Sequence, residues 1–292
     1  MKPRIAITVG DPAGIGPEIA AKAAADPRVL EVCQPEIYGP AEGRTFAPGV
    51  LSADAGRAAY EAITAAVRDA QAGVVQAIAT APVNKLAFAH AGLPWKGHTD
   101  LLGHLTGSER VAMMFWSVPL KVVLATVHVP LADVPRLMTT ALLAETIDLV
   151  AREVPRFGIA SPRLALAGLN PHAGEDGLLG EEEERVLKPA VAAARNRGID
   201  IAGPFPGDTI FVRASRGEFD VVIACYHDQG LIPVKLLAFG ESVNVTLGLP
   251  IIRTSVDHGT AFDIAGMGKA DPSSMIAATL LAAQLAGNRR GL

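Results

Sequence analysis

The sequence predicts an α/β protein built on a mainly parallel β-sheet with helices on its faces. Short apolar runs rich in Val and Ile alternate with longer segments of helical periodicity, as in successive β-α-β units. The 29 glycines and 21 prolines indicate many tight turns between such elements. With 292 residues the chain has room for two domains, although a single large α/β domain of this length is also common.

Seven segments have the apolar, β-branched character of strands: residues 5–9, 74–79, 111–115, 122–126, 164–167, 221–225 and 243–246. Three helices are distinct. Apolar side chains recur on one face between Tyr60 and Ala70, and again from Leu143 to Val154. A third helix begins in the acidic run 181–184, whose carboxylates we expect to form a solvated first turn at the positive end of the helix dipole.

Composition excludes several classes of protein. The formal net charge of −4 disfavours a nucleic-acid binder, which needs an excess of Lys and Arg. Two cysteines, Cys33 and Cys225, are too few for a disulfide framework, so we expect reduced, buried thiols. The apolar N-terminal run breaks too early for a secretory signal, and the longest uncharged run, 272–288, falls short of the ~20 mainly apolar residues of a membrane helix. We therefore expect a cytoplasmic protein.

Three histidines share one setting, because His128, His172 and His227 each follow an apolar strand candidate. Loops beyond the carboxyl ends of parallel strands line the ligand crevice of such sheets, so the three imidazoles could converge on a divalent metal. Their spacing is not a local metal motif, and each could instead bond to a backbone carbonyl. Polar residues nearby could orient the imidazoles or transfer protons: Asn170, Glu175, Asp208, Asp228 and Gln229. Asp228 could equally cap a helix.

A group of polar residues suited to an anion follows these histidines. It comprises Lys235, Asn244 and Arg253, and Arg253 stands in an otherwise apolar segment. An unpaired buried charge is costly, so Arg253 needs either an internal carboxylate or an anionic ligand. A guanidinium matches a carboxylate or a phosphate in bidentate geometry.

Three glycine-containing segments remain. Residues 10–18 lack the spacing of a phosphate loop and carry Pro17 and Glu18 in the first helical turn, which indicates ordinary helix initiation. Residues 97–100 are typical of a turn in which Thr99 or Asp100 caps a helix. In residues 257–266 a carboxylate such as Asp263 could accept hydrogen bonds from ribose hydroxyls, which favours NAD over NADP.

Together these motifs resemble one family, the 4-hydroxythreonine-4-phosphate dehydrogenases of vitamin B6 biosynthesis. The matching blocks run nearly from end to end: residues 10–18, 79–85, 97–99, 170–175, 203–204, 208–209, 226–230, 244–250 and 253–260. The last block also resembles the adenosine-binding loop of the isocitrate and isopropylmalate dehydrogenases. That wider resemblance implies two α/β/α domains with a cleft between them and a non-Rossmann fold.

The resemblance also implies a set of site residues. Metal ligands are His128, His172 and His227, and substrate contacts are His98, Thr99, Lys235, Asn244 and Arg253. We take the NAD contacts to be His258, Gly259, Thr260 and Asp263, in the loop that resembles the adenosine-binding loop, and we assign catalytic roles to His172 and Asp208. The metal is one divalent ion per site, whether Zn, Mg, Co, Mn or Ni. In the family the site lies at the interface of a homodimer.

The implied reaction is oxidation of the secondary alcohol of 4-phosphohydroxy-L-threonine by NAD with metal assistance, followed by loss of CO2 from the β-keto acid. Relatives of the family oxidise threonate or erythronate 4-phosphate, or aromatic cis-dihydrodiols, with similar motifs. Residues 1–90 with 258–292 are expected to form one domain with both termini and the NAD loop. Residues 91–257 are expected to form the other, with the metal and substrate residues.

Two rival functions use part of the same pattern. A metallohydrolase would use three histidines to activate water but would need no dinucleotide loop. A non-catalytic anion-binding protein would use Lys235 and Arg253 but would leave the three histidines unexplained. Reduction of NAD by the purified protein distinguishes both from a dehydrogenase.

Overall fold

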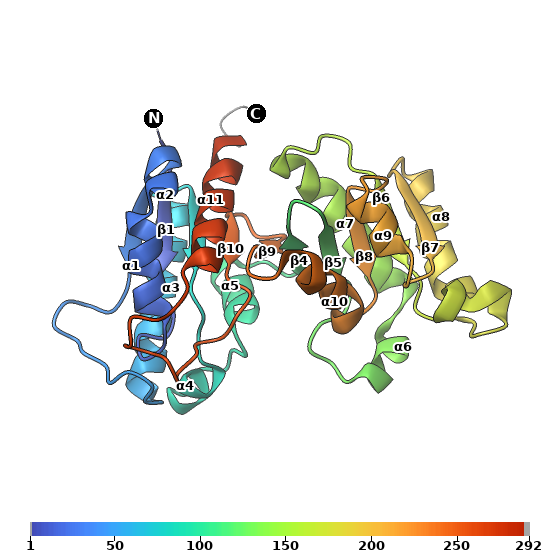
Figure 1. The fold of residues 1–292 in the computed structure, drawn as a ribbon. Coiled ribbons are helices and arrows are strands. Elements are labelled where there is room, and N and C mark those ends of the chain that lie inside the picture. Colours follow the sequence, from blue (N-terminus) through green and yellow to red (C-terminus); the bar gives the residue numbers. More distant parts are fainter. Residues whose placement is uncertain (1, 289–292) are drawn as a thin grey trace. The chain divides into compact units, whose positions relative to one another are not determined.

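The computed structural model describes residues 2–288, which form two compact units. Unit 1 contains residues 2–111 and 243–288, and unit 2 is the continuous segment 112–242 (Figure 1). The sequence placed these divisions at 90/91 and 257/258. The structure moves them because helix α5 (His98–Thr106) packs on α3 (Ala53–Gln71), and because strand β10 (Arg253–Ser255) pairs with β3 (Ala77–Thr80). Four predicted substrate residues, His98, Thr99, Asn244 and Arg253, therefore belong to unit 1.

The sheet of unit 1 has the strand order β2-β1-β3-β10-β9 and is parallel except for the β10-β9 pair. Its other strands are β1 (Arg4–Thr8), β2 (Gln34–Tyr38) and β9 (Val243–Leu247). Alternate residues of β1 face opposite sides of the sheet. Ile5 and Ile7 pack with α1 and α11, whereas Ala6 packs with α3 and α4. The helices are α1 (Gly16–Ala25), α2 (Pro27–Val32), α4 (Lys85–His90) and α11 (Ser273–Asn288), besides α3 and α5.

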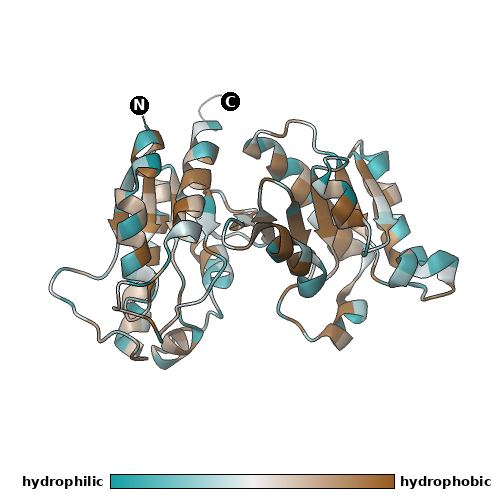
Figure 2. Cartoon of the chain, in the orientation of Figure 1, coloured by the Kyte–Doolittle hydropathy of each residue, from teal (hydrophilic) through white to brown (hydrophobic). Residues whose placement is uncertain are grey.

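Unit 2 has the strand order β4-β5-β8-β6-β7, parallel except for the β4-β5 pair. The strands are β4 (Ala112–Trp116), β5 (Lys121–Leu124), β6 (Leu164–Ala167), β7 (Ile201–Phe205) and β8 (Val221–Ala224). Strands β5, β6 and β8 are brown in Figure 2, as expected for strands buried on both faces. One face packs against α9 (Ile210–Ser215) and α10 (His227–Ala238). Helix α7 (Thr140–Glu153) packs on α8 (Lys188–Asn196), which contacts β7.

Short helical segments complete unit 2: η1 (Leu131–Asp133), α6 (Val134–Leu137), η2 (Val154–Phe157), η3 (Pro171–Gly177) and η4 (Glu183–Leu187). The α/β fold class and all seven predicted strands are confirmed, within a few residues at their ends. Three strands were missed: β2, β7 and β10. No helix within residues 2–288 combines the length and the apolar sequence needed to cross a membrane.

Candidate active site

Two of the three predicted metal ligands lie together in unit 2. His128 follows β5, and His227 is the first residue of α10, which is separated from the end of β8 by two residues. Because β5 and β8 are parallel neighbours, their carboxyl ends meet at one edge of the sheet. The two imidazole centroids are 5.5 Å apart, and both rings line a cavity of about 400 Å³.

Asp228 contacts one of these imidazoles. Its Oδ1 lies 2.6 Å from Nδ1 of His227, and the start of α10 has no side-chain cap. Of the two roles considered for Asp228, the geometry supports orientation of His227. A carboxylate on Nδ1 fixes the ring and leaves Nε2 available to a metal ion.

The third histidine is exposed and lies in a strained turn. His172 belongs to η3, which follows β6, and residues 172–176 all have positive φ. His128 also has a positive φ of 50°. This conformation costs non-glycine residues about 1–3 kcal/mol each and clusters at functional sites. Within residues 2–288, no three His, Cys, Asp or Glu side chains are placed to hold one metal ion, so the complete triad stays a prediction.

In the acidic run 181–184, Glu181 and Glu184 are exposed as expected, but the expectation of a solvated side chain was wrong for Glu183. Glu183 is fully buried. Its Oε1 accepts hydrogen bonds from the backbone N–H groups of Leu169 and Asn170, both at 2.8 Å, and its Oε2 accepts one from the side chain of Asn170. The carboxylate therefore binds the loop between β6 and η3. Sequence reasoning missed it because a glutamate in an acidic run gives no sign of burial.

Gln229 connects the ends of two strands. Its Oε1 accepts a hydrogen bond from the N–H of Cys225, and its Nε2 donates to the carbonyl of Gly168, both at 2.7 Å. This residue therefore braces the segments that lead to His227 and His172.

Two further predicted residues of unit 2 are exposed. Asp208 precedes α9 and Lys235 lies on α10. Neither is brought to the His128–His227 cavity, whose other lining residues are Thr126, Val127, Val129, Leu131, Val134, Tyr226 and Asp228. Both assignments stay predictions.

Unit 1 contains a buried cation with no carboxylate partner. Arg253 is only 2% exposed, and its guanidinium donates to the hydroxyls of Thr80 and Thr246. No ion pair formed by the described residues includes Arg253, so the alternative of an internal salt bridge is wrong. Burial lowers the pKa of Arg253 to about 9.

Unit 1 also contains two buried polar atoms that lack a hydrogen-bond partner and lie on predicted substrate residues. They are His98 Nε2 and Asn244 Oδ1. Burial, and next the charge of Arg253, hold the pKa of His98 well below its ordinary value, so its imidazole is neutral at pH 7. Buried polar atoms are rarely left unpaired, so these two atoms are available to bind a ligand.

The predicted capping role of residues 97–100 was wrong. Helix α5 begins at His98, after Gly97, without a side-chain cap, and Asp100 instead accepts a hydrogen bond from the N–H of Lys96. Thr99 lies half-buried in the first turn. His98 and Thr99 are thus free of a capping function.

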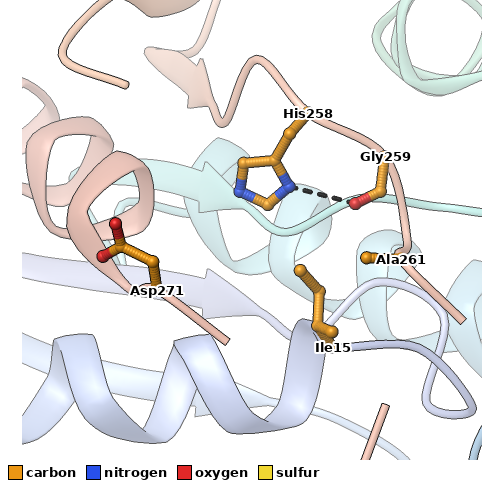
Figure 3. A pocket seen from close by; sticks show the side chains of 5 residues that line it. All are labelled: Ile15, His258, Gly259, Ala261 and Asp271. Carbon is orange, nitrogen blue, oxygen red and sulfur yellow. Dashed lines mark hydrogen bonds between the residues drawn. The ribbon is translucent and has the colours of Figure 1, made fainter. Parts of the chain in front are cut away.

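The predicted NAD loop borders a cavity of about 450 Å³ (Figure 3). His258 and Gly259 line it with Ile15, Ala261 and Asp271 (Figure 3). The Asp271 carboxylate accepts hydrogen bonds from the N–H and the hydroxyl of Ser273 at the start of α11. The carbonyl of Thr260 accepts a hydrogen bond from the N–H of Ile15, which ties this loop to the start of α1.

Asp271 was missed by the sequence analysis, and Asp263 is exposed and does not line this cavity. Hydrogen bonds from Ser273 lower the pKa of Asp271. The only available signal for Asp271 was its position just before α11.

Residues 10–18 start a helix, as predicted. The carboxylate of Glu18 accepts hydrogen bonds from Lys22 and from the N–H of Ala270. This carboxylate thus joins the first turn of α1 to the segment that precedes α11.

Comparison with known proteins gives a consistent result. Residues 11–282 match the family described as pyridoxal phosphate biosynthetic protein PdxA. A 4-hydroxythreonine-4-phosphate dehydrogenase of Geobacter metallireducens is 46% identical over 98% of this chain and 96% of its own. A D-threonate 4-phosphate dehydrogenase of Salmonella typhimurium is 44% identical over 97% and 98%. The crystal structure of 4-hydroxythreonine-4-phosphate dehydrogenase from Klebsiella pneumoniae superimposes with a TM-score of 0.89 at 40% identity, covering 98% of each chain.

Proposed function

Because the chain belongs to the family of the pyridoxal phosphate biosynthetic protein PdxA and is a dehydrogenase, we propose that it oxidises 4-phosphohydroxy-L-threonine with NAD. The secondary alcohol loses a proton and a hydride and becomes the ketone of 2-amino-3-oxo-4-phosphooxybutanoate. This product is a β-keto acid, so its ketone can accept the electron pair of the bond to the carboxylate. Loss of CO2 then leaves 3-amino-2-oxopropyl phosphate.

The observation that carries this proposal is the unpaired guanidinium of Arg253. A buried cation whose partners are all neutral hydroxyls favours an anionic ligand. The substrate has a phosphate and a carboxylate, and a guanidinium matches either. We assign substrate contacts to His98, Thr99, Asn244, Arg253 and Lys235.

A divalent metal suits the histidines of unit 2. His128 and His227 are adjacent, Asp228 orients His227, and the left-handed backbone at His128 and His172 is the kind of strain found at functional sites. Imidazoles coordinate Zn, Co, Mn or Ni, and Mg is the remaining candidate ion. When bound, the ion would supply positive charge near the substrate hydroxyl, and NAD would accept the hydride.

His258, Gly259, Thr260 and Asp263 are proposed to bind NAD. Of these, His258 and Gly259 line the cavity that also contains Ile15, Ala261 and Asp271, a combination of apolar walls and a carboxylate that suits a base and ribose hydroxyls. Asp208 is proposed to transfer a proton.

A second copy of the chain is proposed to complete the assembly as a homodimer with its active site at the interface. Helix α10 and the residue that follows it expose four large apolar side chains near Lys235: Ile232 at 66%, Leu236 at 82%, Leu237 at 48% and Phe239 at 79%. Such a group is unusual on a monomer surface. Sedimentation of the protein tests this, and a stable monomer would contradict it. The free thiols Cys33 and Cys225 are consistent with a cytoplasmic location.

D-threonate 4-phosphate is the second candidate substrate, because a relative at 44% identity is named for it. It carries the same phosphate and carboxylate but has a hydroxyl in place of the amino group. The metallohydrolase and anion-binding alternatives lose their support, since the relatives compared are dehydrogenases.

The test measures NADH absorbance with the purified chain, each divalent metal in turn, and four substrates. These are 4-phosphohydroxy-L-threonine, D-threonate 4-phosphate, D-erythronate 4-phosphate and an aromatic cis-dihydrodiol. We expect the largest kcat/KM with 4-phosphohydroxy-L-threonine. Faster turnover of another substrate would reject the vitamin B6 assignment but keep the dehydrogenase class.

A further inference from the structure

Glu183 is a fully buried carboxylate whose hydrogen bonds all go to one loop. Both oxygens are engaged: Oε1 with two backbone N–H groups and Oε2 with the side-chain amide of Asn170. No ion pair within the described part of the chain includes Glu183. Burying an acid without a cation is costly, so these hydrogen bonds must offset a large desolvation penalty.

The loop that Glu183 binds leads directly into the left-handed turn of His172. Asn170 precedes Pro171 and His172 in sequence, and six successive residues from His172 to Gly177 have positive φ. Gly174, inside that turn, lies against Glu183, because a Cβ there would come within 2.7 Å of Glu183 Oε2. The carboxylate thus contacts the turn both before and after His172.

Glu182 adds a second acceptor to the same amide. Its Oε2 accepts a hydrogen bond of 2.7 Å from Asn170 Nδ2. The side-chain amide of Asn170 therefore donates to both glutamates. Replacing Glu183 with Gln turns one of its two acceptor oxygens into an N–H donor, which then opposes either the two backbone N–H groups or the amide of Asn170. If Asn170 turns over to relieve this, its Oδ1 opposes the carboxylate of Glu182.

We propose that Glu183 is a positioning residue for His172: its buried carboxylate holds the left-handed turn in the conformation that presents this imidazole to the metal ion. The proposal rests on the proposed function, in which His172 is a metal ligand. It explains why a turn with four strained non-glycine residues persists on the surface of unit 2. A residue in this position acts on metal affinity and touches neither substrate nor NAD.

The test is the affinity of the full-length protein for Co²⁺ alone, followed by the d–d absorption of the bound ion. Glu183→Gln should weaken Co²⁺ binding by about 10–100-fold, the usual effect of losing a partner that orients a ligand. Glu184→Gln is the matched control, since Glu184 is exposed and pairs with Lys188, and its affinity should stay within twofold. Hydrogen exchange at the amides of Leu169 and Asn170 should accelerate only in Glu183→Gln.

A rescue experiment separates hydrogen bonding from general damage. In the Glu182→Gln/Glu183→Gln double variant, Asn170 can turn over and its Oδ1 can accept from both new amides. The double variant should bind Co²⁺ more tightly than Glu183→Gln. Failure to recover any affinity would overturn the hydrogen-bond argument, because additive damage would weaken binding further.

Other outcomes are also decisive. A folded Glu183→Gln protein with Co²⁺ affinity within twofold of wild type overturns the proposal. Should Glu183→Gln fail to fold, Glu183→Asp, which withdraws the carboxylate by one methylene, takes its place under the same criterion. His172→Ala tests the premise separately: unchanged Co²⁺ affinity there rejects His172 as a ligand, whereas loss there with a normal Glu183→Gln rejects only the role of Glu183.

Discussion

Replacing Arg253 with Met should separate stability from ligand binding. Burial lowers the pKa of Arg253 from 12.5 to about 9, and one pKa unit corresponds to about 1.4 kcal/mol. Burial therefore disfavours the charged guanidinium by about 5 kcal/mol. Its three hydrogen bonds to Thr80 and Thr246 offset this by about 1.5 kcal/mol each.

These contributions nearly cancel, so Arg253→Met should change the free energy of unfolding by less than about 2 kcal/mol. Breaking a buried ion pair would cost about 3–5 kcal/mol, because the partner charge would be left buried alone. The effect on substrate binding should be much larger. Loss of two charge-assisted hydrogen bonds to a phosphate or carboxylate, about 3–4 kcal/mol, raises KM by roughly 100–1000-fold.

Urea unfolding of the ligand-free protein and steady-state kinetics measure the two effects. Arg163→Met is the control: Arg163 pairs with Asp220 at 3.0 Å on the surface and lies in neither proposed site. It should leave KM unchanged. If Arg253→Met lowers the free energy of unfolding by more than about 3 kcal/mol and leaves KM unchanged, the reasoning is refuted and Arg253 is a structural residue.

Three other predictions follow from burial. The pKa of His98 is held well below 6.5 by burial and then by Arg253. Below pH 6.5 the unfolded chain therefore takes up a proton at His98 that the native chain does not, and the native state loses stability as the pH falls. His98→Gln should therefore lose less stability than wild type between pH 7 and 5.5 in urea unfolding, and an equal loss would contradict this. Burial raises the pKa of Cys33 to about 11 and of Cys225 to about 12, so neither thiol should react with a disulfide reagent at pH 8 until urea unfolds the protein; prompt native reaction would count against this. Gly230→Ala places a Cβ 2.5 Å from Leu124 Cδ2 and should destabilise the protein by about 1–3 kcal/mol in urea unfolding, with a neutral result showing that α10 can move aside.

The strands that could be predicted are those buried on both faces. Residues 164–167 and 221–224 are continuous apolar runs, which the parallel sheet requires. The missed strands lack this signal. β2 and β7 are edge strands that contain proline, and β10 has only three residues, one of them a buried arginine.

The part of the site that could be predicted lies at the ends of these buried strands. The proximity of His128 and His227 follows from their position at the ends of neighbouring parallel strands. The burial of Glu183 and the exposure of Asp263 depend on loops whose paths no local periodicity encodes. Tertiary contacts, not propensity, decide those positions.

Unit 2 is inserted into the sequence of unit 1, and this affects the order in which the two units can fold during translation. The strands of unit 2 form one continuous segment, all of it synthesised before residue 243. Unit 1 must wait for β10, which fills the place between β3 and β9, and for α11, which covers one face of its sheet. During translation the middle of the chain can therefore complete its core first. Strands β1, β2 and β3 can pair with one another early, but β3 lacks its neighbour β10 and one face of the sheet lacks α11 until these last segments emerge.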